Sequence, residues 1–147
     1  ACVTTMFDFY GLRDDFPGRL DAKGTPDEKV RFIEKKFEED IGNRRFLGYL
    51  SLHEFESLLF SSPSDIAETL NAVEKEPELR AIRKLFASPE EINDSPQTAP
   101  SKRILGLFPQ YNKVFFGRLI AQNIGLQKIR QECQHFHKWL DSLENLK

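Results

Sequence analysis

The sequence predicts an α/β fold in which a small parallel sheet is flanked by helices and followed by a helical carboxyl-terminal half. Residues 3–9 and 46–50 are apolar, β-branched and aromatic runs of strand length. A helical pattern separates these runs, and a strand–helix–strand crossover favours parallel, right-handed pairing. After residue 60, apolar residues recur three and four positions apart, which is typical of helices.

The chain has 147 residues, which is the length of one domain with a proper core. We expect a single α/β domain over 1–147, with a core over 1–60 and a mainly helical cap over 61–147. Two strands do not form an independently stable sheet. We therefore expect that further strands lie upstream and that the chain is an amino-terminally truncated fragment.

The composition is that of an ordinary soluble globular protein, with 39% hydrophobic and 30% charged residues. The formal net charge of −2 gives no overall attraction to nucleic acid or anionic lipid, so such contacts would need a local basic patch. Cys2 and Cys133 form neither a disulfide framework nor a CxxC metal site. No apolar run approaches the roughly 20 residues that span a bilayer. We expect a cytoplasmic protein without membrane contact.

The predicted first strand, residues 3–9, is apolar at nearly every position, as in a parallel strand covered on both faces. Its first charge, Asp8, falls near the carboxyl end, where open α/β sheets bind their ligands. Asp8 is therefore a candidate site residue. It could equally accept backbone N–H groups in the turn that follows.

The helix between the strands has clear start and stop signals. Thr25, Pro26 and Glu28 form a capping-box start, and Gly42 ends the helix. The charged run over residues 34–39 falls largely on the face opposite the apolar stripe. We expect that run to be a solvated surface without a function.

The second strand runs into a helix that carries His53, Glu54 and Glu56 at the junction. Ser51 and Glu54 fit the S-x-x-E pattern, which predicts that Ser51 caps the helix and Glu54 is its capping partner. His53 and Glu56 stand three residues apart on one helix face, a spacing that suits a divalent metal or a carboxylate that orients an imidazole. The alternative is a structural histidine and a surface acid near a helix start.

Further helix starts follow at Ser62, Pro77 and Ser88, and we read these helices as scaffold. Residues 92–100 form the least regular stretch and predict a loop. From residue 112 onward the pattern is helical. His135 and His137 diverge on a helix, so we expect them to be structural or exposed.

The loop leads to Ser101, Lys102 and Arg103 at the start of an apolar helix. A helix amino terminus with a hydroxyl cap and two cations is suited to binding phosphate. The alternative is a plain serine cap with two exposed basic residues. Lys113 and Arg118 could extend a local basic surface.

Several segments together resemble the RloG-like bacterial family, which is usually described only as a domain of unknown function. These segments are TTMFDFYGL, DFPG, LHEFESLLF, EEINDSPQTAPSKRI and CQHFHKWLDSLE, and the resemblance spans almost the whole chain. Members of that family look longer at the amino end, where a VEGxTE-like stretch follows an early strand. The resemblance implies a genomic setting near restriction or phage-defence genes, often beside an ATPase.

That family looks related to Toprim-type domains, which implies a Toprim- or Rossmann-like core and Mg²⁺-dependent phosphoryl transfer on nucleic acid. Under this resemblance Asp8 matches the first acid of the DxD motif. Tyr10 stands where the second acid is expected, so Glu54 or Glu56 would have to supply the missing ligand.

Two function hypotheses follow. In the first, the chain is a Mg²⁺- or Mn²⁺-dependent, nuclease-like enzyme of a defence system, with the metal held by Asp8, Glu54 and Glu56. Ser101, Lys102 and Arg103 would bind the phosphodiester, and His53 would act with Glu56 as a catalytic residue. In the second, the chain is a non-catalytic interaction domain that docks a partner ATPase or nucleic acid. A small-molecule enzyme that uses the same crevice is a third option.

Overall fold

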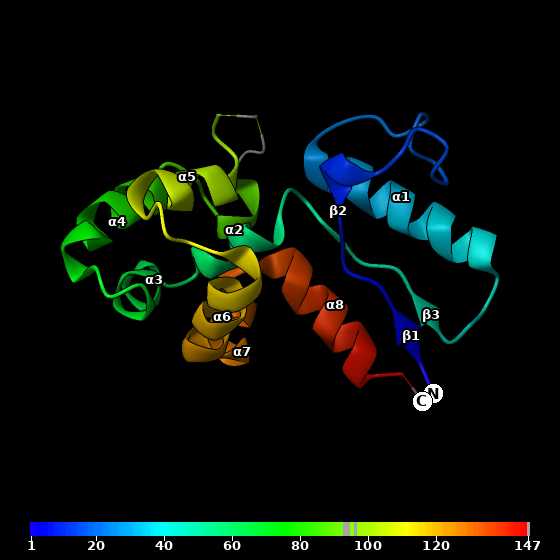
Figure 1. The fold of residues 1–147 in the computed structure, drawn as a ribbon. Helices are drawn as coiled ribbons and strands as arrows, with labels where there is room; N and C mark the ends of the chain where they lie inside the picture. Colours follow the sequence, from blue (N-terminus) through cyan, green and yellow to red (C-terminus); the bar gives the residue numbers. More distant parts are fainter. Residues whose placement is uncertain (93–94, 96, 147) are drawn as a thin grey trace. The chain divides into compact units, whose positions relative to one another are not determined.

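The computed structural model describes residues 1–92, 95 and 97–146, which divide into two compact units (Figure 1). Unit 1 holds Ala1–Leu52 together with the chain from Lys138 onward, and unit 2 holds His53–His137. Most of the core predicted over 1–60 therefore lies in unit 1. The loop predicted over 92–100 lies partly outside the described residues, at positions 93, 94 and 96.

Four short strands in unit 1 form two parallel pairs. They are β1 (Val3–Thr4), β2 (Phe7–Asp8), β3 (Phe46–Leu47) and β4 (Leu50–Ser51). β1 pairs with β3 and β2 with β4, and both pairs keep the same register. The predicted parallel crossover is confirmed. Each predicted strand is interrupted where the Thr5 hydroxyl accepts from the backbone N–H of Tyr49 at 3.2 Å.

One helix packs against the strands of unit 1 from each side, without covering β1 and β2 fully. α1 (Pro26–Ile41) lies on one face, where the Phe37 ring meets the Phe46 ring edge-on at 4.8 Å. On the other face Trp139 of α8 (Gln134–Glu144) stacks on Tyr49 at 4.5 Å and donates from Nε1 to the Thr4 hydroxyl at 2.8 Å. Residues on opposite sides of an extended chain thus pack against different helices.

The predicted ends of α1 are confirmed. Thr25 and Glu28 form the reciprocal capping box, and Gly42 ends the helix with φ of 61°, in the left-handed region that glycine adopts readily. Val30 and Ile33 are fully buried between these ends. They form the core of unit 1 with Leu50 and Leu52, against which Phe9, Leu12, Phe16 and Ala22 pack.

The prediction that residues 3–9 are covered on both faces is wrong. Val3 is 62% exposed, and Phe7 is exposed as well. Phe7 does face α1, with its ring 6.4 Å from that of Phe37, but α1 packs its buried residues against β4 and the segment after it. Among the described residues, β1 and β2 each have a paired neighbour on one edge only. Within the described residues, the apolar run therefore lies at the edge of both strand pairs.

The prediction that the charged run over residues 34–39 of α1 is a solvated surface is also wrong at two positions. The backbone N–H of Leu50 donates to Glu34 at 2.8 Å, and that of Gly48 donates to Glu38 at 3.0 Å. Burial raises the pKa of Glu38, and the bond from Gly48 opposes that shift. These two carboxylates accept hydrogen bonds from backbone N–H groups along the outer edge of β3 and β4.

Unit 2 is helical, which confirms the predicted helical carboxyl-terminal half. Its α-helices are α2 (Phe55–Leu59), α3 (Pro63–Thr69), α4 (Glu76–Lys84), α5 (Pro100–Leu107), α6 (Arg118–Ile124), α7 (Leu126–Glu132) and the first turn of α8. Unit 2 also contains two short 3₁₀ helices, η2 (Val73–Lys75) and η3 (Pro89–Glu91), and a π-helix, η4 (Lys113–Gly117). A third 3₁₀ helix, η1 (Phe9–Gly11), lies in unit 1. Ser62 and Ser88 cap α3 and η3 as predicted.

Two further predictions concern the chain as a whole. Both cysteines are free, and Cys2 is exposed whereas Cys133 is buried. In the part of the chain that the structure describes, no helix is both long and apolar enough to cross a bilayer.

Candidate functional site

Buried polar residues concentrate where the chain leaves β4 and enters α2. Ser51, His53, Glu54, Glu56 and Ser57 are all buried. The predicted Ser51 cap is wrong, because Ser51 lies in β4 and α2 begins only at Phe55, after Glu54. The junction is therefore longer than the S-x-x-E pattern indicates.

Glu54 fixes the start of α5. Its carboxylate accepts the backbone N–H of Ser101 at 2.9 Å and the Ser101 hydroxyl at 3.1 Å. The residue before the helix, Ala99, has no side chain that could cap it. A carboxylate at a helix amino terminus satisfies an otherwise unpaired N–H and interacts favourably with the helix dipole. Glu54 is thus a remote cap, supplied from 47 residues away.

The predicted phosphate-binding residues surround that same helix start. Ser101 follows Pro100 inside α5, so the prediction that Ser101 caps the helix is wrong. Arg103 donates from Nε to the carbonyl of Thr98 at 2.7 Å. Lys102 is exposed. The helix terminus does hold an anion, as its chemistry predicts, but that anion is the carboxylate of Glu54. Phosphate binding by Ser101, Lys102 and Arg103 stays a prediction.

Glu56 is fully buried and lies beside two residues of a later segment. Its Oε2 is 3.0 Å from Nζ of Lys113, whose side chain is half-exposed. Burial raises the pKa of Glu56, and the ammonium of Lys113 opposes that shift. Burial and the charge of Glu56 also raise the pKa of Tyr111, so its hydroxyl keeps its proton. We name Glu56, Tyr111 and Lys113 the buried cluster.

The buried cluster lies at the start of the π-helix η4. An ideal Cβ on Gly117 would lie 3.2 Å from the Tyr111 hydroxyl and 3.6 Å from the Phe55 ring. Glycine at this position therefore lets η4 approach α2 and Tyr111 closely. π-helical turns are rare and frequent at functional sites. The ion pair between buried Glu56 and half-exposed Lys113 and the close approach at Gly117 thus hold this turn in place.

The outer side of the same turn is apolar. Val114 is 85% exposed and Phe115 is 66% exposed, whereas Gly117 and Ile120 are buried. Arg118 and Leu119, at the start of α6, are also exposed. We name Val114, Phe115, Arg118 and Leu119 the η4–α6 surface. Large apolar side chains that cluster on a surface are typical of contact sites for other molecules.

Asp8 ends β2 in unit 1, and its register partner is Ser51 at the end of β4. Its position near the carboxyl end of a parallel strand is confirmed. His53 and Glu54 follow Ser51 by two and three residues along the chain. Asp8 and Ser51 thus share one end of the strand pair in unit 1, which is the position that binds ligands in α/β sheets.

The predicted metal set of Asp8, Glu54 and Glu56 can be compared with these contacts. A metal ligand needs an available oxygen, but Glu54 already accepts from Ser101 and a lysine ammonium lies against Glu56. Both acids are therefore already engaged with protein groups, and metal binding by Asp8, Glu54 and Glu56 stays a prediction. Within the described residues, no group of three or more His, Cys, Asp or Glu side chains is arranged to hold one.

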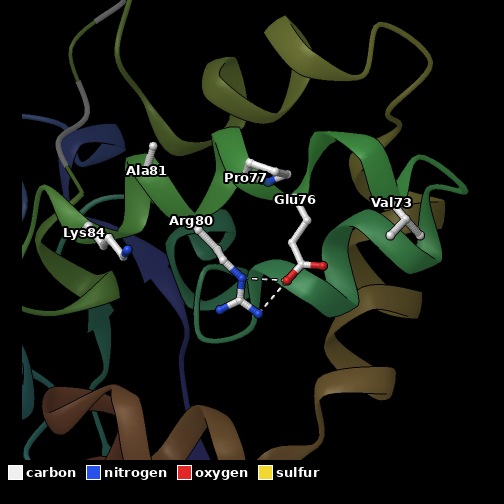
Figure 2. Close-up of a pocket in the computed structure, with 6 residues that line it drawn as sticks. All are labelled: Val73, Glu76, Pro77, Arg80, Ala81 and Lys84. Atoms are coloured by element: carbon white, nitrogen blue, oxygen red, sulfur yellow. Dashed lines mark hydrogen bonds and ion pairs between the residues drawn. The ribbon is translucent and has the colours of Figure 1, made fainter.

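Two hollows lie elsewhere on unit 2. One of about 450 Å³ follows α4, where Arg80 donates from Nε to Glu76 at 2.6 Å across its lining (Figure 2). The other, of about 630 Å³, lies along α7 and the start of α8, where Arg130 donates from Nε to Nδ1 of His137 at 3.0 Å. Neither hollow is lined by a predicted site residue.

Sequence reasoning identified His53, Glu54 and Glu56 as a junction but missed Tyr111 and the π-helix. No local sequence pattern around Tyr111, Lys113 and Phe115 predicts a π-helix or a buried tyrosine. Lys113 was singled out for its charge, and the buried partner of that charge is 57 positions earlier in the chain.

Residues 1–144 match the model of a family described as a domain of unknown function, DUF4276. No curated protein and no solved structure matches the chain.

Proposed function

Because the chain belongs to the DUF4276 family of domains of unknown function, whose description leaves the activity open, we propose from its own contacts that it is a non-catalytic interaction domain. In this proposal the η4–α6 surface docks a partner protein. The observation that carries it is the exposure of Val114 and Phe115 on a π-helix that the buried cluster holds in place.

A protein partner fits this surface better than nucleic acid does. Nucleic-acid surfaces combine stacking aromatics with several cations that contact phosphates. Here Lys113 is paired with Glu56, so Arg118 is the cation that remains on the outer side. An apolar acceptor groove that also carries an acidic group would match the η4–α6 surface.

Burial of Val114 and Phe115 alone does not contribute enough free energy for stable binding. Burying an exposed valine and an exposed phenylalanine contributes about 3–5 kcal/mol in total. Association costs at least about 4 kcal/mol in lost translational and rotational freedom. Leu119 and Arg118 must therefore contribute for binding to be stable, which supports a partner that covers the whole η4–α6 surface.

The partner we propose is the ATPase that the RloG-like resemblance implies beside this protein. The test is a titration of the full-length protein against that purified ATPase, with wild type, Phe115→Ser and Leu20→Ser compared. Leu20 is an exposed apolar residue of unit 1 and serves as the matched control. We expect Phe115→Ser to weaken binding roughly tenfold or more, because it removes a central aromatic contact. Equal binding of wild type and Phe115→Ser, or no binding at all, would exclude this docking function.

A second candidate is Mg²⁺- or Mn²⁺-dependent phosphoryl transfer on nucleic acid in a restriction or phage-defence system. The observation that favours it is the register of Asp8 with Ser51, which puts an acid at the carboxyl ends of two paired parallel strands. Asp8 would be the metal ligand, and Glu54 and Glu56 could join it only after leaving Ser101 and Lys113. His53 would serve as acid or base, with Ser101, Lys102 and Arg103 near the phosphate.

Calorimetric titration of Mn²⁺ into the full-length protein separates the two candidates. Wild type, Asp8→Ala and Glu56→Gln are compared, with Asp15→Ala as an exposed acidic control. Stoichiometric binding that is lost in both site variants and kept in the control would support the metal-dependent candidate. If Mn²⁺ does not bind, or if it binds wild type, Asp8→Ala and Glu56→Gln equally well, the metal-dependent candidate is excluded.

A further inference from the structure

The hollow along α4 carries a row of exposed apolar side chains. Val73 of η2 and Pro77 and Ala81 of α4 line it, and these residues stand four positions apart. Leu85 continues the row, because it directly follows α4 and keeps helical backbone angles. All four residues are exposed. Since residues four apart lie on the same face of a helix, an apolar row runs along the outer face of α4.

A charged row runs beside the apolar one and includes a cation without a partner. Glu76, Arg80 and Lys84 also line the hollow and follow the same spacing of four (Figure 2). Arg80 donates from Nε to Glu76 at 2.6 Å, so these two charges offset each other. Lys84 is exposed, lies at the end of the hollow away from Val73, and has no hydrogen bond or ion pair among the described residues. The hollow is therefore positively charged at one end.

The opposite face of α4 is fixed within unit 2. Leu79 is fully buried there. Arg83 donates from Nη1 to the Phe86 carbonyl at 2.9 Å and from Nη2 to Glu132 of α7 at 3.1 Å. Sites for small molecules enclose most of their ligand, whereas a hollow lined by η2 and α4 alone contacts an occupant from one side. An elongated element of another protein therefore suits this hollow better than a small molecule does.

We propose that the hollow along α4 docks an amphipathic helix of a partner protein, with an acidic side chain of that helix beside Lys84. Helices pack along rows of residues four apart, so a helix with leucines at that spacing fits the row from Val73 to Leu85. The charge of Lys84 sets the chemistry of the partner, because a glutamate or aspartate would pair with the ammonium and a lysine would be repelled. None of these residues belongs to the η4–α6 surface, so this is a second docking site.

The test uses a dye-labelled model helix of about 18 residues, with leucines four positions apart, glutamates beside them and alanine elsewhere. Fluorescence polarisation measures the Kd of this acidic helix for the full-length protein. We expect wild type to bind it, and we expect Leu85→Ser and Lys84→Glu each to raise the Kd roughly tenfold or more. Leu20→Ser and Lys23→Glu make the same changes at exposed positions of unit 1 and should leave the Kd unchanged.

A second model helix, in which lysine replaces each glutamate, tests the charge at Lys84 directly. Wild type should bind this basic helix roughly tenfold more weakly than the acidic one, and Lys84→Glu should reverse the preference. The proposal is overturned if wild type does not bind the acidic helix, if it binds both helices equally, or if Lys84→Glu and Lys23→Glu have equal effects. Self-association of wild type that is lost in Lys84→Glu would assign the hollow to a second copy of this chain and would overturn the proposal too.

Discussion

At the scale of single residues, several acidic side chains serve as acceptors for distant backbone N–H groups. Glu34 and Glu38 accept from the strand that follows α1, and Glu54 accepts at the start of α5. Glu90 accepts from both His135 and Phe136 at 2.9 Å, at the start of α8. Each bond satisfies a backbone group that would be costly to bury alone.

Glu56 is different because its neighbours are an ammonium and a hydroxyl, and burial raises its pKa. A raised pKa means that the folded state binds the proton more tightly than the unfolded state. The contribution of Glu56 to the free energy of unfolding is therefore most favourable below its unfolded value of about 4.5. That contribution is lost as pH rises through the raised pKa.

We accordingly expect Glu56→Gln to reduce the fall in the free energy of unfolding as pH rises above about 4.5. Urea unfolding at several pH values measures this dependence. The pKa of Glu38 is also raised, so wild type and the variant share a slope of the same sign from that residue. The difference between them isolates Glu56. Glu91→Gln, at an exposed acid, is the control, and identical slopes for all three proteins would contradict the prediction.

The residues of the candidate site could be found from the sequence more readily than their partners. His53, Glu54 and Glu56 stand out because they follow an apolar strand run directly. What Glu54 binds was not predictable, because Ser101 is 47 positions away and the S-x-x-E pattern offers a local partner instead. Local patterns encode contacts within about four residues, whereas burial at this junction depends on how distant segments pack.

At the scale of elements, locally capped helices were predictable and remotely capped ones were not. The Thr25 box of α1 and the Ser62 cap of α3 lie within three residues of the groups they bind. The caps of α5 and α8 come from Glu54 and Glu90 instead, across 47 and 45 positions. Sequence patterns therefore predicted the existence of these helices better than the way they begin.

The two glycines of α5 and η4 provide a matched test of element packing. Gly106 has no atom within 4 Å of an added Cβ, so Gly106→Ala should stabilise the protein by about 0.5–1 kcal/mol. Gly117 has a helical φ of −58°, yet its added methyl would meet the Tyr111 hydroxyl. We expect Gly117→Ala to destabilise the protein by about 1 kcal/mol, as measured by chemical unfolding.

The same experiment in a Tyr111→Phe background identifies the cause. Without the hydroxyl, the methyl of Gly117→Ala has more room and its cost should shrink. A Gly117→Ala variant that is stabilised as much as Gly106→Ala would mean that η4 does not need the close approach to Tyr111 described above.

At the scale of the whole molecule, the parallel crossover was predictable because chain order and strand pattern leave few alternatives. Which segments of the chain make up unit 1 was not predictable. Its second helical layer comes from the carboxyl-terminal end of the chain, where Trp139 stacks on Tyr49. The helical pattern of residues 134–146 indicates an apolar face but does not say which surface it covers.

Trp139 therefore provides a test of how the chain end completes unit 1. Trp139→Ala removes the stack on Tyr49 and the hydrogen bond to Thr4, and we expect a loss of about 2–3 kcal/mol for this partly buried side chain. Hydrogen exchange should show faster exchange in β1–β4, while α3 and α6 of unit 2 keep their protection, because those helices belong to the other compact unit.

Trp139→Phe keeps an aromatic ring and should lose less of the free energy of unfolding than Trp139→Ala. Leu146→Ala, at an exposed position near the same chain end, should change little. Equal deprotection of both units in Trp139→Ala would show that the chain end stabilises the molecule as a whole instead of unit 1.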